Sequence, residues 1–203
     1  MIKNIVFDFD GTLADTSVFI ENFTEIEGLN TQESFKKIRD NGLESLLKNN
    51  KIPTWKVPYI IYKYRAKINK NITKAKTFEG IFEVLNKLKE EDYQMGIIST
   101  NSNKNIREFL KINKMEYFEF IYTSSLFGKH KVIKKILKEY KIKPDEMIYV
   151  GDEDRDINAA RMTGTKIISV SWGYNSKELL LKNKPDYIVD SPFQIPIILT
   201  NLR

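Results

Sequence analysis

Apolar runs alternate with amphipathic helical patterns along most of this chain, and this alternation restricts the fold more than any other feature. The central runs are apolar nearly throughout, as in parallel strands that are covered on both faces. Residues 81–88 and 133–140 place apolar side chains at i, i+3, i+4 and i+7, which predicts two helices. The pattern as a whole predicts right-handed crossovers and an α/β fold with a doubly wound, Rossmann-like parallel sheet. The predicted strands are residues 2–9, 94–99, 118–123, 147–151, 166–171 and 186–189.

Residues 15–75 interrupt the alternation. They read as helices without a strand, at 16–27, 31–40, 43–49 and after Pro58. We therefore expect a helical cap domain at 15–75, inserted into an α/β core domain made of residues 1–14 and 76–203. A helical block that follows the first strand is placed above the carboxyl ends of the sheet and could act as a lid. The alternative is an added structural layer with no gating role.

Composition narrows the classes of partner. The chain has no cysteine, so disulfides and thiolate metal sites are excluded. No apolar run reaches the eighteen or so residues that span a bilayer, and the first strand begins too early to leave room for a signal peptide. The net charge of +6 is spread along the chain among Glu and Asp. We expect a cytoplasmic monomer or homodimer that binds neither nucleic acid nor membrane.

Two carboxylates follow the first apolar run, at Asp8 and Asp10. A spacing of two in a strand places both side chains on the same side. At about 4 Å and an effective dielectric constant near 20, two like charges repel by roughly 4 kcal/mol. A cation must offset this repulsion at the end of a buried strand, and we therefore expect a metal ion there.

Polar residues also follow three later strands. In open α/β sheets, ligands bind outside the carboxyl ends of the strands. Ser99, Thr100 and Asn101 end one predicted strand, Lys129 comes after the next, and residues 151–156 of sequence Gly-Asp-Glu-Asp-Arg-Asp end the fourth. The sequence thus predicts one site that all four segments build.

These four segments resemble the motifs of the haloacid dehalogenase superfamily, in the correct order and over nearly the whole chain. Residues 8–12 match Asp-x-Asp-Gly-Thr, Ser99 the Ser/Thr that follows a hydrophobic strand, Lys129 the lysine, and residues 151–156 Gly-Asp-x-x-x-Asp. The helical block looks like the cap of the phosphoglycolate-phosphatase-like branch. Hydrolytic dehalogenases of the superfamily typically lack the second aspartate, so Asp10 favours phosphate transfer over carbon–halogen cleavage.

The resemblance implies a Mg²⁺-dependent phosphatase of a small phosphorylated metabolite, phosphoglycolate-like or a sugar phosphate. Asp8, ionised at neutral pH, can attack phosphorus and form an aspartyl-phosphate. Asp10 would be the general acid and base. Mg²⁺ takes oxygen ligands, and by resemblance these are the Asp8 carboxylate, the Asp10 backbone carbonyl and the Asp152 carboxylate. Glu153 and Asp154 are the alternatives to Asp152, and acidic residues here could instead cap a helix.

Three further residues complete the expected site. Ser99 would donate a hydrogen bond to a phosphoryl oxygen, with the adjacent Thr100 as an alternative. Lys129 would hold the nucleophile and the phosphate as a point charge, with Lys131 as its alternative. Asp156 would help to position Lys129 and the metal without binding the metal directly.

Two other functions compete with the phosphatase. A phosphomutase would use the same nucleophile but return the phosphoryl group to a bound sugar phosphate. A non-catalytic binding module would have no reason to keep mutually repelling acids at one site. We expect His130 to lie outside the site, and we expect residues 172–174, Trp-Gly-Tyr, to pack their loop rather than bind substrate.

Overall fold

The computed structural model describes most of the chain outside the predicted cap. The described residues are 1–17, 19, 25–26, 29–30, 36–37, 39–42, 45, 54–56, 59, 62, 66 and 70–202.

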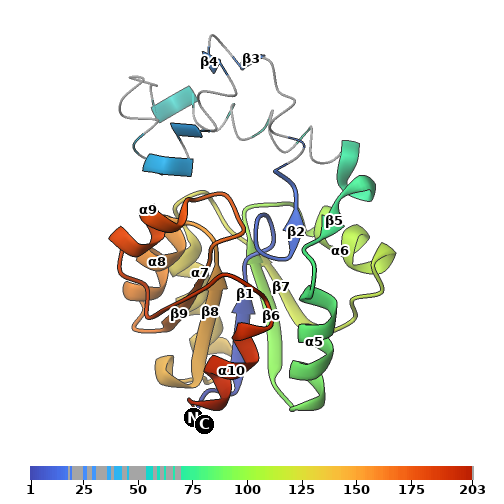
Figure 1. Ribbon diagram of the computed structural model, residues 1–203, viewed down its shortest axis with the longest axis vertical. Coiled ribbons are helices and arrows are strands. Elements are labelled where there is room, and N and C mark those ends of the chain that lie inside the picture. The colour runs from blue at the N-terminus through green and yellow to red at the C-terminus, as the bar shows by residue number, and fades with distance from the viewer. Residues whose placement is uncertain are drawn as a thin grey trace.

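A six-stranded sheet forms the centre of the molecule (Figure 1), with strand order β10-β9-β8-β1-β6-β7. Every pairing within it is parallel, and β1 lies between β8 and β6. This confirms the predicted doubly wound sheet. The strands are β1 Asn4–Phe7, β6 Gln94–Ser99, β7 Phe118–Thr123, β8 Met147–Gly151, β9 Lys166–Val170 and β10 Tyr187–Val189.

Helices cover both faces of this sheet (Figure 1). One apolar cluster joins the sheet to α5 Ile81–Glu90, α6 Asn103–Ile112 and α10 Gln194–Thr200. The other cluster joins it to α7 Lys129–Glu139, α8 Asp154–Arg161 and α9 Lys177–Lys182.

The alternation of side chains along β1 divides them between the two clusters. Ile5 and Phe7 belong to the cluster of α5, whereas Val6 belongs to the cluster of α7 and α8. Asp8 continues the alternation on the side of Val6. The first carboxylate of the chain is thereby directed toward the face that α7 and α8 cover.

Both predicted helical stripes correspond to helices. The apolar residues at 81, 84, 85 and 88 are buried on α5. On α7 the residues at 133 and 136 are buried, but Tyr140 lies just past the helix end and is 42% exposed. Side-chain caps define the starts of α6 and α9, where the hydroxyls of Ser102 and Ser176 accept backbone N–H groups.

A short antiparallel ribbon stands where the chain leaves and re-enters the core. It pairs β2 Ala14–Asp15 with β5 Lys76–Thr77. A second ribbon, β3 Glu25–Ile26 with β4 Leu29–Asn30, lies inside the segment predicted to contain no strand, and that prediction is wrong there. Strands of two residues are too short to produce a readable apolar run, which is why the sequence did not reveal them.

The predicted helices of the cap fall mostly outside the described residues. Residues 19, 36–37, 39–41, 45, 59, 62, 66 and 70–71 are helical where they are described. The described part of the chain also contains the short 3-10 helices η1 Thr54–Lys56, η2 Ile72–Lys74 and η3 Pro144–Glu146. Among all the described residues, no helix is long and apolar enough to cross a membrane.

Candidate active site

A tight turn after β1 brings Asp8 and Asp10 to the carboxyl edge of the sheet. The backbone N–H of Phe9 donates to Asp8 Oδ1 at 2.7 Å, which orients that carboxylate. Gly11 has φ +78°, and a Cβ at this position would overlap the carboxylate of Asp152. Glycine is therefore required here both for its backbone conformation and for the space it leaves.

Lys129, the first residue of α7, joins two of the predicted carboxylates. Its Nζ lies 2.5 Å from Asp8 Oδ2 and 2.5 Å from Asp156 Oδ1. All three side chains are buried. Burial alone would lower the pKa of Lys129, but the negative charges of Asp156 and Asp8 raise this pKa well above its usual range. The lysine is thus a permanent cation beside the expected nucleophile.

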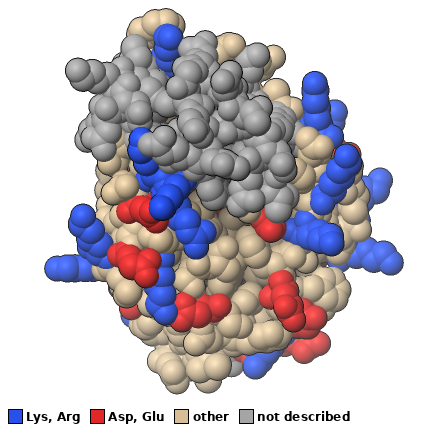
Figure 2. All heavy atoms as spheres, turned by 45° about the horizontal axis from the view of Figure 1, so that its top comes forward, with Lys and Arg blue, Asp and Glu red and all other residues tan. Residues whose placement is uncertain are grey.

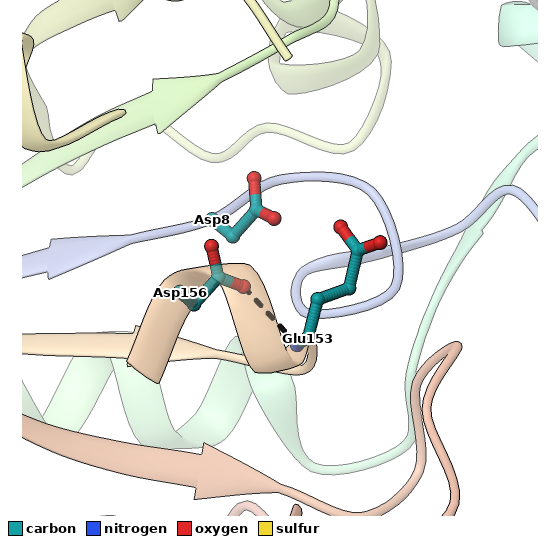
Figure 3. Close-up of side chains that lie close together, drawn as sticks. All are labelled: Asp8, Glu153 and Asp156. Atoms are coloured by element: carbon teal, nitrogen blue, oxygen red, sulfur yellow. Dashed lines mark hydrogen bonds between the residues drawn. The ribbon is translucent and has the colours of Figure 1, made fainter. Parts of the chain in front are cut away.

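Three carboxylates converge at this edge of the sheet (Figure 3). The side chains of Asp8, Glu153 and Asp156 each offer an oxygen, and these oxygens all lie within 4.8 Å of one another. Asp8 comes from the end of β1, and the other two come from the start of α8. Asp156 Oδ2 also accepts the backbone N–H of Glu153 at 3.1 Å, so Asp156 caps its own helix as well as binding Lys129.

The electrostatics of this acidic cluster favour an added cation. Burial, together with repulsion from Asp156 and Glu153, raises the pKa of the Asp8 carboxyl to about 7, although Lys129 acts in the opposite direction. A divalent cation would relieve both the repulsion and the loss of hydration, and carboxylate oxygens are the ligands that hard cations prefer. The donor set therefore fits Mg²⁺.

Asp152 is fully buried beside this cluster, but it is not one of the three acids that converge within the described residues. Its Oδ1 accepts the hydroxyl of Thr12 at 2.7 Å, and its Oδ2 accepts the backbone N–H of Tyr174 at 2.8 Å. Burial raises the pKa of Asp152 well above its usual range, and repulsion from Glu153 and Asp8 adds to the rise. The alternative acid Glu153 lies in the cluster, whereas Asp154 does not.

Three polar side chains surround Asp10. Thr16 Oγ1 and Asn101 Nδ2 donate to Asp10 Oδ1 at 2.9 and 3.0 Å, and Ser99 Oγ lies 3.4 Å from Oδ2. Burial raises the pKa of Asp10, while these hydrogen bonds lower it. Asn105 of α6 in turn donates to Asn101 Oδ1 at 2.8 Å and fixes the amide. Asp10 is thereby held in one orientation by residues at or just after the ends of β2 and β6, with support from α6.

The two candidates for phosphate contact at the end of β6 differ in burial. Ser99 is fully buried, and its hydroxyl accepts the backbone N–H of Asn101 at 2.9 Å. Thr100 is half-buried. Ser99 is therefore the residue that the structure brings beside Asp10, while Thr100 is the more accessible of the two.

Arg155 is a site residue that the sequence reading missed. Its Nε donates to Glu153 Oε2 at 2.8 Å, and its Nη1 donates to the carbonyl of Leu126 at 2.9 Å. Burial would lower the pKa of Arg155, but the neighbouring Glu153 raises it. The guanidinium thus ties the start of α8 to the loop that precedes Lys129. In the sequence it is one arginine among 33 basic residues, with no spacing that distinguishes it.

The loop after β9 also reaches the site. Trp172 Nε1 donates to the Thr12 carbonyl at 3.2 Å, and a Cβ at Gly173 would overlap Asp152. Tyr174 contacts both Asp152 and Thr16. We predicted that this segment packs its loop, and its packing is against the acidic residues themselves. In the sequence, the only indication that this segment belongs to the site was its position after a strand next to β8, at the carboxyl edge of the sheet.

Figure 2 shows the face of the molecule at this edge. Lys and Arg side chains stand out along both margins of the described part of this view, and Asp and Glu lie mostly at its left and below. This agrees with the diffuse charge pattern of the sequence.

The parallel sheet, with buried aspartates and one buried lysine at its carboxyl edge, defines an α/β enzyme of the haloacid dehalogenase class. The family model for haloacid dehalogenase-like hydrolases matches residues 5–170. The chain belongs to this family of hydrolases.

Similar proteins cover the full length of the chain. A phosphoglycolate phosphatase of Synechococcus elongatus is 25% identical, over 99% of this chain and 99% of its own length. The pyrophosphatase PpaX of Bacillus mycoides is 28% identical, over 100% of this chain and 99% of its own. A solved structure of a haloacid dehalogenase-like hydrolase from Streptococcus pneumoniae is 27% identical, with a TM-score of 0.78 and 98% coverage of both chains.

Proposed function

We propose that this protein is a Mg²⁺-dependent phosphatase that hydrolyses a small phosphorylated metabolite, phosphoglycolate-like or a sugar phosphate. The observation that carries the proposal is the buried Lys129, 2.5 Å from Asp8 and 2.5 Å from Asp156, next to Asp10. A cation held in this way can bind both a carboxylate nucleophile and the phosphate that it attacks. The relatives named phosphoglycolate phosphatase and pyrophosphatase support the same chemistry.

The reaction would proceed in two displacements. An Asp8 carboxylate oxygen forms a bond to phosphorus as the bond to the leaving oxygen breaks, and Asp10 gives its proton to that oxygen. Asp10, now a carboxylate, then takes a proton from water as this water attacks the aspartyl-phosphate. Inorganic phosphate leaves and Asp8 is restored. The pKa of Asp10, raised by burial, supports its role as the proton donor of the first step.

Mg²⁺ would be held by the carboxylates of Asp8 and Asp152 and by the backbone carbonyl of Asp10. When bound, it would neutralise charge between the nucleophile and the phosphate. Lys129 and Asp156 would keep Asp8 in place, and Ser99 or Thr100 would contact the phosphate. The repulsion among buried acids supports this assignment.

We also propose that residues 15–75 form a cap domain over this site and supply its substrate specificity. The ribbon of β2 and β5 supports this boundary, because it brings Asp15 beside Lys76. A contact within the described residues supports the placement: the backbone N–H of Ser176 donates to the Arg39 carbonyl at 2.7 Å. Gly42 lies against the Asp154 carboxylate, where a Cβ would meet Asp154 Oδ2 at 2.5 Å.

The function can be tested with para-nitrophenyl phosphate. We expect inorganic phosphate to be released with Mg²⁺, and we expect a chelator to abolish this release because the uncompensated acids would repel the substrate. A panel of phosphoglycolate, sugar phosphates and pyrophosphate would then identify the substrate. Turnover of a sugar phosphate only when it is primed with a bisphosphate, without net phosphate release, would instead indicate a mutase. A protein that turns over none of these substrates would contradict both the phosphatase and the mutase function.

The second carboxylate ligand of the metal can be identified with two matched amide variants. Asp152→Asn is expected to weaken Mg²⁺ affinity by about tenfold or more. Even the loss of a residue that only supports a metal ligand typically costs about ten- to a hundredfold. Glu153→Gln should have a smaller effect, because its carboxylate already binds Arg155. The measurement is the Mg²⁺ concentration that half-saturates the rise in melting temperature. The opposite order of effects would make Glu153 the ligand.

A further inference from the structure

We propose that Tyr174 is a positioning residue for Asp10 that acts through the hydroxyl of Thr16. This inference rests on the proposed function, in which Asp10 gives a proton to the leaving group. Loss of the Tyr174 hydroxyl should therefore lower kcat/KM most for substrates whose leaving group needs that proton.

A continuous line of hydrogen bonds connects these residues. The Tyr174 hydroxyl lies 2.6 Å from Thr16 Oγ1, and Thr16 Oγ1 lies 2.9 Å from Asp10 Oδ1. Thr16 is fully buried, and Tyr174 is 6% exposed. Tyr174 and Thr16 are 158 residues apart in the chain, so the contact is a product of the fold.

The direction of this line follows from counting protons. A threonine hydroxyl has one proton to donate and two lone pairs to accept with. Thr16 Oγ1 donates its one proton to Asp10 Oδ1. Thr16 must therefore accept in its bond with Tyr174, and the tyrosine hydroxyl is the donor. Tyr174 thus fixes the rotation of the Thr16 hydroxyl toward Asp10.

The arrangement also distinguishes the two oxygens of Asp10. Oδ1 accepts from both Thr16 and Asn101, at 2.9 and 3.0 Å. Oδ2 has the longer contact, with Ser99 Oγ at 3.4 Å. Two donors therefore hold Oδ1, and the Tyr174–Thr16 pair keeps Oδ2 turned away from Thr16.

Tyr174 is itself held rigidly by the opposite side of the site. Its backbone N–H donates to Asp152 Oδ2 at 2.8 Å, and the preceding Gly173 packs directly on the Asp152 side chain. One residue thus contacts the expected metal carboxylate through its backbone and the expected proton donor through its hydroxyl. The position of Asp10 is in this way set relative to Asp152.

The test compares two substrates that differ by one nitro group, phenyl phosphate and para-nitrophenyl phosphate. Para-nitrophenolate leaves readily without a proton, whereas phenolate, with a pKa near the value of about 10 of tyrosine, benefits from one. The measured quantity is kcat/KM, which reports the steps up to release of the leaving group and excludes the later attack by water. For Tyr174→Phe we expect a loss of about tenfold or more with phenyl phosphate and of less than about threefold with para-nitrophenyl phosphate.

Further variants separate positioning from general damage. Thr16→Val, which is equal in shape but has no hydroxyl, should reproduce the selective loss, and Tyr174→Phe should add nothing in an Asp10→Asn background. Tyr117→Phe is the matched control, since it removes a hydrogen bond to Asn86 Oδ1 of the same length, 2.6 Å, outside the site. It should leave both substrates unaffected.

Two results would overturn the inference while leaving the phosphatase intact. These are equal losses on both substrates in Tyr174→Phe, or no loss on either. An Asp10→Asn variant that shows no difference between the substrates would instead contradict the role proposed for Asp10. A wild-type protein that releases no phosphate would contradict the proposed function itself.

Discussion

Replacing Asp8 by Asn is expected to abolish phosphate release, with a fall in kcat of at least about ten-thousand-fold, as when the nucleophile of a hydrolase is removed. The amide has the same size as the carboxylate but cannot form the aspartyl-phosphate. Lys129 keeps its second partner, Asp156, so the site should stay assembled. The measurement is inorganic phosphate released from para-nitrophenyl phosphate with saturating Mg²⁺. Full activity in this variant would contradict the whole mechanism.

When metal is absent, the same variant should gain stability relative to the wild type as the pH rises. The pKa of Asp8 rises from 3.8 to about 7 on folding, so the fold prefers the neutral form. For such a group, stability is complete below the unfolded pKa and is lost as the pH rises through the folded pKa. Asn does not titrate, and the difference in melting temperature should therefore grow in favour of the variant between about pH 4 and about pH 7. A constant difference across this range would show that folding does not raise the pKa of Asp8.

Replacing Lys129 by Met is expected to have the second largest effect, on stability and activity together. The substitution leaves the buried carboxylates of Asp8 and Asp156 without their shared cation. Removing one partner of a buried ion pair costs about 3–5 kcal/mol of unfolding free energy. Phosphate release should also fall by about a hundredfold or more, because a preorganised positive charge is lost from the transition state. Chemical denaturation without metal, near pH 8, measures the first effect.

A matched substitution on the same helix controls for the change of side chain. Lys135 pairs with Glu139 on the surface of α7 at 3.9 Å, and its side chain is 62% exposed. Lys135→Met should change stability by less than about 1 kcal/mol, since exposed pairs contribute little, and should leave activity unchanged. Equal losses in the two variants would show that the burial of Lys129 is not what makes it important. Partial recovery of Lys129→Met by Mg²⁺ would support the electrostatic explanation.

The core sheet could be predicted closely from the sequence, because each of its strands is a run of apolar residues long enough to recognise. The predicted bounds of 94–99, 118–123 and 147–151 are those of β6, β7 and β8. The first strand was predicted to continue to Phe9, but β1 ends at Phe7. The backbone turns there to place the two carboxylates. The ribbon of β2 and β5 could not be predicted, because only its long-range pairing defines it.

The site was predictable to the extent that its residues follow strands directly. Asp8 and Ser99 could be chosen by position and Lys129 through the family resemblance, and the structure brings Lys129 to Asp8 and Ser99 to Asp10. Asn101 and Arg155 have roles that depend on the direction in which a side chain points, and a single sequence carries no information about that. The expected ligand Asp152 and its neighbour Glu153 both lie at the end of β8, and their assignment stays a prediction.

The paired ends of the inserted segment have a consequence for how such an enzyme can change. Asp15 and Lys76 are cross-strand partners, so the chain departs from the core and returns to it at points only about 5 Å apart. This pairing joins the two ends of the proposed cap domain without involving the residues between them. Since we propose that this domain supplies the substrate specificity, exchanging it between these two strands is expected to alter the choice of substrate. The six strands and their buried acids would not have to move.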